Sequence, residues 1–73
     1  MDADAVRALR MRHARETLAL LKRQHCPPTR EDAIALHELH ARHERELGRV
    51  DTAERAESRA AYVRDLLSAP VRQ

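Results

Sequence analysis

Apolar residues recur every three or four positions along most of this chain, which is the spacing of one face of an α-helix. The pattern is clearest over residues 30–47, where Ala33, Leu36, His40 and His43 fall on one stripe. Two positions of this stripe are imidazoles, where an aliphatic side chain would be usual. We expect this segment to be the central helix, against which the rest of the chain packs.

Stripes of the same kind predict a helix on either side of the central one. The first covers about residues 3–24, with Leu9, His13 and Leu20 on one face. The third covers about residues 52–68, where alanines dominate the inward positions. No segment alternates apolar and polar residues as a half-buried strand does. The chain is therefore expected to be all-α.

The predicted breaks between the helices carry recognisable signals. Pro27 and Pro28 end the first helix because neither can donate a backbone hydrogen bond. Thr29 followed by Asp32 resembles a capping box at the start of the second helix. Gly48, the only glycine, is suited to ending it. Asp51, followed by Glu54, is expected to be the N-cap of the third helix.

Short loops make neighbouring helices antiparallel, so the first two helices are expected to form a hairpin, extended by the third helix into a three-helix bundle. The whole of residues 1–73 is then one small domain. In this register His13 lies opposite His43, between apolar layers, and His40 lies one turn away. We expect all three helices to meet at this imidazole layer, with Ala56 and Ala60 making room for it.

The composition predicts a small core. The chain has 73 residues, of which 42% are hydrophobic and one, Tyr62, is aromatic. Because domains of this size have little apolar area to bury, we expect self-association. A single cysteine excludes an internal disulfide, and no apolar run approaches the 18 residues that a membrane span needs. We therefore expect a cytoplasmic protein that does not span a membrane.

The histidine layer has three interpretations, of which two, a structural layer and a pH-sensitive one, share the same chemistry. Histidines in helical cores are usually neutral, hydrogen-bonded residues with a structural role. Alternatively, His13, His40 and His43 form a metal site, since three neutral imidazoles suit Zn or Ni. No other cofactor is expected.

A second set of apolar stripes predicts a protein-binding surface. On this basis we expect a small helical protein-interaction module, such as an adaptor, a chaperone or an inhibitor-like regulator, with a protein partner or a second copy bound to an apolar helix face. The alternative is that the stripes merely complete the chain's own core or the seam of a homodimer. The candidate residues are Met11, Leu18, Ile34, Leu39, Tyr62 and Leu66.

The arginine-rich first helix suggests nucleic acid as a third alternative. Its cations are scattered around the helix and it has no aromatic residue for base stacking, so nucleic-acid binding is disfavoured. The chain has no nucleophile elbow, catalytic triad order or phosphate-binding glycine loop, and we expect no enzymatic activity. We identify no internal repeat.

Overall fold

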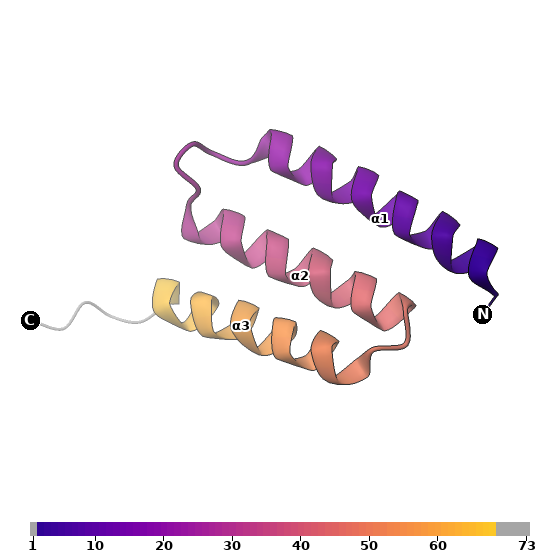
Figure 1. The fold of residues 1–73 in the computed structure, drawn as a ribbon. Coiled ribbons are helices and arrows are strands. Elements are labelled where there is room, and N and C mark those ends of the chain that lie inside the picture. Colours follow the sequence, from indigo (N-terminus) through magenta and orange to yellow (C-terminus); the bar gives the residue numbers. More distant parts are fainter. Residues whose placement is uncertain (1, 69–73) are drawn as a thin grey trace, which may run out of the picture.

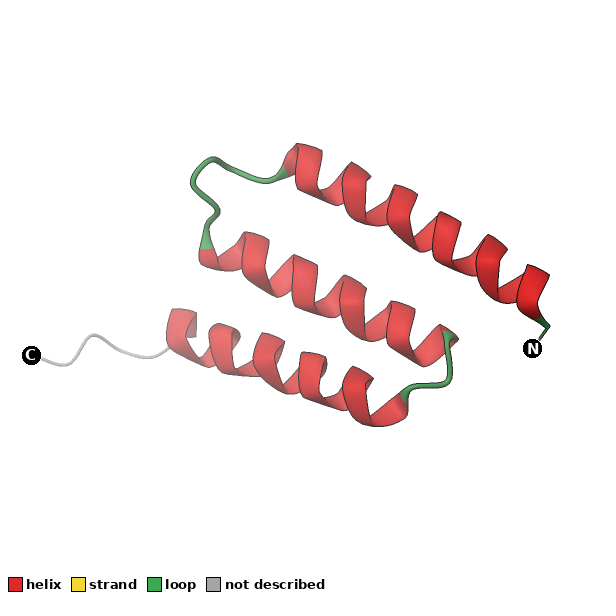
Figure 2. Cartoon of the chain, in the orientation of Figure 1, coloured by secondary structure: helices red, strands yellow, loops and turns green. Residues whose placement is uncertain are grey.

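The computed structural model describes residues 2–68, and these residues form three helices without strands. Helix α1 spans Ala3–Arg23, α2 spans Arg30–Glu46 and α3 spans Val50–Ser68. Successive helices run in opposite directions and are joined by two short connections (Figures 1 and 2). The all-α three-helix fold predicted from the periodicity is confirmed.

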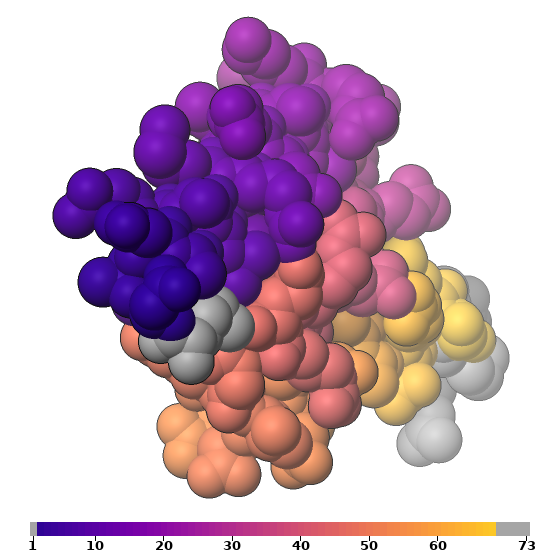
Figure 3. Space-filling view, turned by 90° about the vertical axis from the view of Figure 1, so that its right-hand side faces the viewer, coloured from indigo at the N-terminus to yellow at the C-terminus, as the bar shows by residue number. Residues whose placement is uncertain are grey.

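The helices lie side by side in a flat layer with α2 in the middle (Figure 1). The Cα atoms extend over 27 Å across the layer and 11 Å through it. Helices α1 and α3 have no Cα atoms within 8 Å of each other. Viewed from the end that holds the α2–α3 connection, α1 lies at the top and α3 at the bottom (Figure 3). The expectation that all three helices meet at one layer is therefore wrong.

Alanines hold α2 and α3 together. Ala53, Ala56 and Ala60 of α3 are 0–1% exposed, and Ala41 of α2 is 3% exposed. Because a methyl group is the only side chain at these positions, the two backbones approach closely along their length. Ile34, at 8% exposure, is the one large aliphatic residue that is buried among the described residues, and it lies seven positions before Ala41 on the same side of α2.

Helix α1 packs against α2 across larger side chains and touches it at fewer places. Leu9, Leu20 and Leu36 are all only half-buried at this interface. No side chain larger than alanine is completely buried among the described residues. The core is consequently small, and most of it belongs to the α2–α3 pair.

Side chains cap the first two helices at their starts. The Asp2 carboxylate accepts a hydrogen bond from the Ala5 backbone N–H at 2.7 Å. Thr29 and Asp32 form the predicted capping box. The Asp32 carboxylate also accepts from the backbone and the ring of His25. The hydrogen bond from the Thr29 backbone, opposed by partial burial and supported by His25, lowers the pKa of Asp32 to about 2.

Gly48 separates α2 from α3, as predicted. Its φ of +79° is in the left-handed region that side chains disfavour. The third helix nevertheless starts at Val50, two residues earlier than expected, so Asp51 lies in its first turn and is not the N-cap. An acid in that turn still complements the positive end of the helix dipole. None of the three described helices is long and apolar enough to cross a bilayer.

Candidate functional site

Two buried imidazoles stack on each other between α1 and α2. The rings of His13 and His43 have centroids 3.9 Å apart and planes inclined by 12°. Both residues are buried, at 7% and 6% exposure. The pairing of these two histidines across the hairpin agrees with the register predicted from the loop length.

Each imidazole faces a carboxylate from the opposite helix. Nε2 of His43 lies 3.1 Å from Oε1 of Glu16, and Nε2 of His13 lies 3.3 Å from Oε1 of Glu46. The other oxygen of each carboxylate accepts a hydrogen bond from an arginine. Arg42 donates to Oε2 of Glu16 at 3.1 Å, and Arg12 donates to Oε2 of Glu46. The two helices thus make the same set of contacts in opposite directions.

A short repeat, which the spacing of the apolar residues does not reveal, produces this arrangement. The pattern Arg-His-x-Arg-Glu occurs at residues 12–16 and again at residues 42–46. In a helix the histidine and the glutamate of this pattern lie three residues apart, on the same side. Two antiparallel copies facing each other therefore pair each histidine with the other copy's glutamate. A search for repeats shorter than a whole structural unit would have found it.

The surroundings of His43 favour its neutral form. Burial and the neighbouring His13 lower the pKa of His43, and together they outweigh the hydrogen bond to Glu16, which acts in the opposite direction. A neutral imidazole keeps one nitrogen free of a proton, and that nitrogen can accept a hydrogen bond or bind a metal.

His40 does not belong to this cluster, contrary to our prediction. Its side chain is 50% exposed, and its Nε2 lies 3.8 Å from Oε1 of Glu44 on the same helix. The reason is angular: α1 packs on one side of α2, and the ring of His40 lies at the edge of that contact. Glu44 is itself buried, and its Oε2 has no hydrogen-bond partner among the described residues, with Arg49 at 3.7 Å.

The alanines of α3 do not face the imidazoles either. Ala41 and His43 are two residues apart on α2, so they point to nearly opposite sides of this helix. Ala41 is buried with the alanines of α3, whereas His43 faces α1. The imidazole cluster is therefore a two-helix site.

Three of these groups lie close enough together to share one metal ion. A ring nitrogen of His13, a ring nitrogen of His43 and a carboxylate oxygen of Glu16 all lie within 4.8 Å of one another. The donor set of the structure thus has Glu16 where the sequence analysis expected His40. It is the only group of this kind among the described residues.

The residues of the predicted protein-binding surface separate into two classes. Met11 and Leu18 on α1 are each 58% exposed, and Tyr62 and Leu66 on α3 are 65% and 41% exposed. Ile34 is buried at 8% exposure.

Leu39 is half-buried in the contact between α1 and α2. Helix α2 has a neighbour on both sides, so its predicted stripe, Ile34 with Leu39, completes the protein's own packing and does not form an uncovered surface. On the outer helices, α1 and α3, the predicted apolar residues remain exposed.

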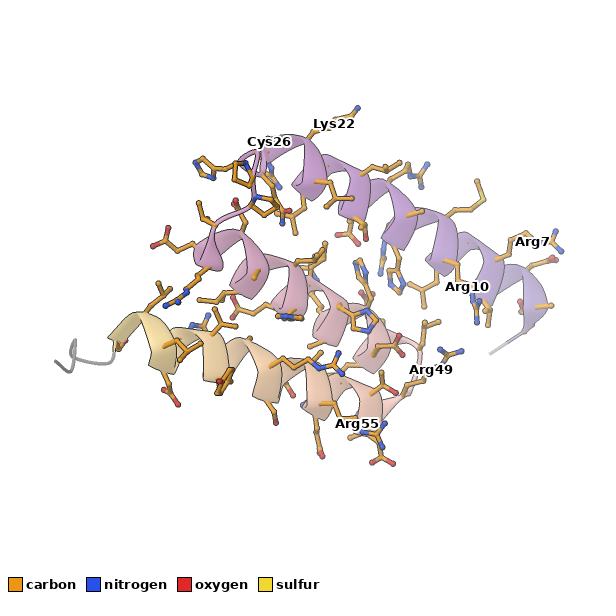
Figure 4. The ribbon with its side chains drawn as sticks, turned by 60° about the vertical axis from the view of Figure 1, so that its left-hand side comes forward. Arg7, Arg10, Lys22, Cys26, Arg49 and Arg55 are labelled. Carbon is orange, nitrogen blue, oxygen red and sulfur yellow. The ribbon has the colours of Figure 1, made fainter. Side chains whose placement is uncertain are left out.

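The cations of α1 do not form a continuous stripe. Arg7 and Arg10 lie near its N-terminal end, whereas Lys22 lies at the other end, beside the loop that holds Cys26 (Figure 4). Arg12 is bound by Glu46. This spread does not match a row of phosphates.

Comparison of the chain with protein-family models, with curated proteins and with solved structures gives no match.

Proposed function

We propose that this chain is a small helical protein-interaction module that assembles with further copies of itself, edge to edge. The observation that carries the proposal is the flat single layer, which leaves the outer sides of α1 and α3 uncovered. Large apolar side chains lie exposed on both of these helices. Exposed apolar residues that follow one helix face are typical of protein-binding surfaces.

The outer side of α1 has the spacing of a helix-pairing surface. Met11, Ala14, Leu18 and Leu21 follow one another at intervals of three, four and three residues, and all four are exposed. We call these four residues the α1 seam. Cations flank the seam, and none of them forms an ion pair with another described residue: Arg7, Arg10, Arg15 and Lys22.

The outer side of α3 combines exposed apolar residues with carboxylates. Tyr62, Asp65 and Leu66 lie on the C-terminal half of its outward face, and Asp51 and Glu54 lie on the N-terminal half; all five are exposed. We call these five residues the α3 edge. Two exposed arginines, Arg55 and Arg59, share the N-terminal half of this face with Asp51 and Glu54.

Charge decides which helix should cover the α1 seam. Pairing α1 with a second α1 would bring Arg10 and Lys22 of the two copies together, which is unfavourable. The α3 edge of another copy, with three carboxylates against the two neighbouring arginines, brings a net negative charge to the same cations. We therefore commit to the α3 edge of a second copy as the occupant of the α1 seam.

This mode of contact uses two different surfaces, so each copy retains one free seam and one free edge after pairing. Such head-to-tail contacts lead to rings or open chains and do not stop at a dimer. Sedimentation equilibrium under reducing conditions should therefore show association that continues beyond the dimer at micromolar concentrations. Raising the salt concentration should weaken it, because exposed charges are screened.

Two variants test the contact from both sides. Leu18→Glu blocks the seam and Tyr62→Glu blocks the edge, so each variant alone should be monomeric. Their equimolar mixture should form a one-to-one dimer, since one seam and one edge remain intact and neither complex can extend. Val50→Glu is the matched control: Val50 is 48% exposed but lies at the α2–α3 turn, and this variant should associate like the unaltered chain. A wild-type monomer, or a mixture that stays monomeric, would exclude the proposal.

A further inference from the structure

We propose that His13, His43 and Glu16 bind a single divalent transition-metal ion between α1 and α2. The donors come from both helices, and their ligand atoms lie within 4.8 Å of one another. This site lies on the opposite side of α1 from the seam, so it does not depend on the proposed self-assembly.

The donor chemistry selects the class of metal. Two imidazole nitrogens and one carboxylate oxygen form the ligand set that Zn²⁺ and neighbouring first-row ions accept, whereas Mg²⁺ prefers oxygen ligands only. Ligand bonds of about 2.0–2.2 Å place the donors of a tetrahedral site somewhat over 3 Å apart, so the ligand atoms have to move closer by little more than an ångström. The stacked rings of His13 and His43 also have to rotate out of their nearly parallel arrangement, because a metal ion lies in the plane of each imidazole that binds it. His43 and Glu16 are already at that spacing, 3.1 Å apart.

The carboxylate of Glu16 is already oriented for this role. Its Oε2 accepts a hydrogen bond from Arg42, which leaves Oε1 directed at the ring of His43. A second partner that holds the far oxygen of a ligand is a recurrent feature of protein metal sites. The glutamate side chain is 36% exposed, so it can move by the required distance.

The site also has an approach for the ion. Glu16 and Arg42 border a shallow depression on one face of the layer, between α1 and α2. His43 borders a second depression on the opposite face. A water molecule or a small ligand can therefore complete the coordination from either side, as in metal sites with three protein ligands.

Titration calorimetry of the full chain with Zn²⁺, under reducing conditions, measures the affinity and the stoichiometry of metal binding directly. We expect one ion per chain with a dissociation constant in the micromolar range or tighter, and no measurable binding of Mg²⁺. Because a ligand of the folded state stabilises it, Zn²⁺ at about a hundredfold excess over the dissociation constant should raise the melting temperature by roughly 10 °C or more.

Substitutions identify the ligands. His43→Gln and Glu16→Gln should each weaken Zn²⁺ binding by about tenfold or more. Glu16 is partly exposed, so its replacement tests the site even where a change at the buried His43 impairs folding, which circular dichroism with a chelator present will report. His40→Gln and Cys26→Ser are the matched controls and should bind Zn²⁺ like the unaltered chain, since both residues are exposed and lie outside the cluster.

Three results would overturn the assignment. The first is an affinity for Zn²⁺ weaker than about millimolar, which is too weak for a specific site. The second is unchanged binding in both His43→Gln and Glu16→Gln. The third is loss of binding in His40→Gln or Cys26→Ser, which would place the ion on the surface of α2 or in the α1–α2 loop.

Discussion

At the scale of single residues, the centre of this protein is a polar contact. His13 and His43 occupy positions where the helix periodicity would place aliphatic side chains, and both are buried. The cost of burying them is offset by carboxylates from the opposite helix, at 3.1 and 3.3 Å. The α1–α2 contact therefore depends on hydrogen bonds and ion pairs as well as on apolar area.

This dependence makes the metal-free protein sensitive to acid. The pKa of His43 is lowered in the folded state, chiefly by burial and by His13, so the unfolded chain binds more protons as the pH falls below about 6.5. Stability is thus fully present above the unfolded pKa and declines as the pH drops through the window between the two values. Urea unfolding with a chelator present should show a lower midpoint at pH 5.5 than at pH 7.5.

The variant His43→Leu tests the assignment of this effect. Leucine has a similar size and cannot titrate, so most of the difference between the two pH values should disappear. Glu16 and Arg42 also face His43 and act on it with opposite signs, so both stay unchanged in this comparison. Equal stability of the unaltered chain at both pH values would contradict the burial of His43.

At the scale of helices, the two interfaces of α2 have different chemistry. The α2–α3 interface is built from alanines that are almost completely buried. The α1–α2 interface contains half-buried leucines and the imidazole cluster. Close backbone contact should make α2 and α3 the more stable pair, because tight packing leaves fewer voids and more contacts per residue.

A leucine in the alanine interface should separate α2 and α3. Ala60 is 1% exposed, so Ala60→Leu adds volume where none is free, and we expect it to lower the free energy of unfolding by about 1–3 kcal/mol. The neighbouring Ala61 is exposed, and Ala61→Leu should change the free energy of unfolding by less than about 0.5 kcal/mol. Chemical denaturation of both variants measures the difference, and similar values would contradict the close packing.

At the scale of the whole molecule, the flat layer leaves α1 with one neighbour. It packs against α2 on one side, and none of its Cα atoms lies within 8 Å of a Cα atom of α3. The layer also separates the polar cluster from the exposed apolar residues. The imidazole cluster lies between α1 and α2, whereas the exposed apolar residues of α1 and α3 lie on the outer edges. A helix held from one side is expected to open before the rest of the fold.

Hydrogen exchange should reveal this order. In dilute, metal-free protein, the amides of α1 should exchange faster than those of α2 and α3, because α1 can detach while the alanine-packed pair stays intact. Mass spectrometry on peptides from each helix measures the rates. Adding Zn²⁺ should slow exchange in α1 most, since two of the proposed ligands, His13 and Glu16, belong to it. Uniform protection across all three helices would argue against a separable α1.

Local features of this fold could be predicted from the sequence because they depend on nearby residues. The three helices follow from the spacing of apolar residues, and the proline pair, the Thr29–Asp32 box and Gly48 mark most of their ends. The antiparallel hairpin, and with it the meeting of His13 and His43, follows from the short first loop. The start of α3 was misplaced by two residues, since Asp51 can serve equally as a cap or as a first-turn acid.

The arrangement of the helices was decided only by the tertiary structure. An apolar stripe indicates that a helix face is covered, but it does not identify the neighbour that covers this face. Ile34 and His40 show the two resulting errors: the first proved to be core and the second proved to be exposed. Glu16 entered the site for the same reason, because its pairing with His43 depends on the side from which α1 approaches α2. Periodicity thus determined which faces exist, and packing in three dimensions decided which of them meet.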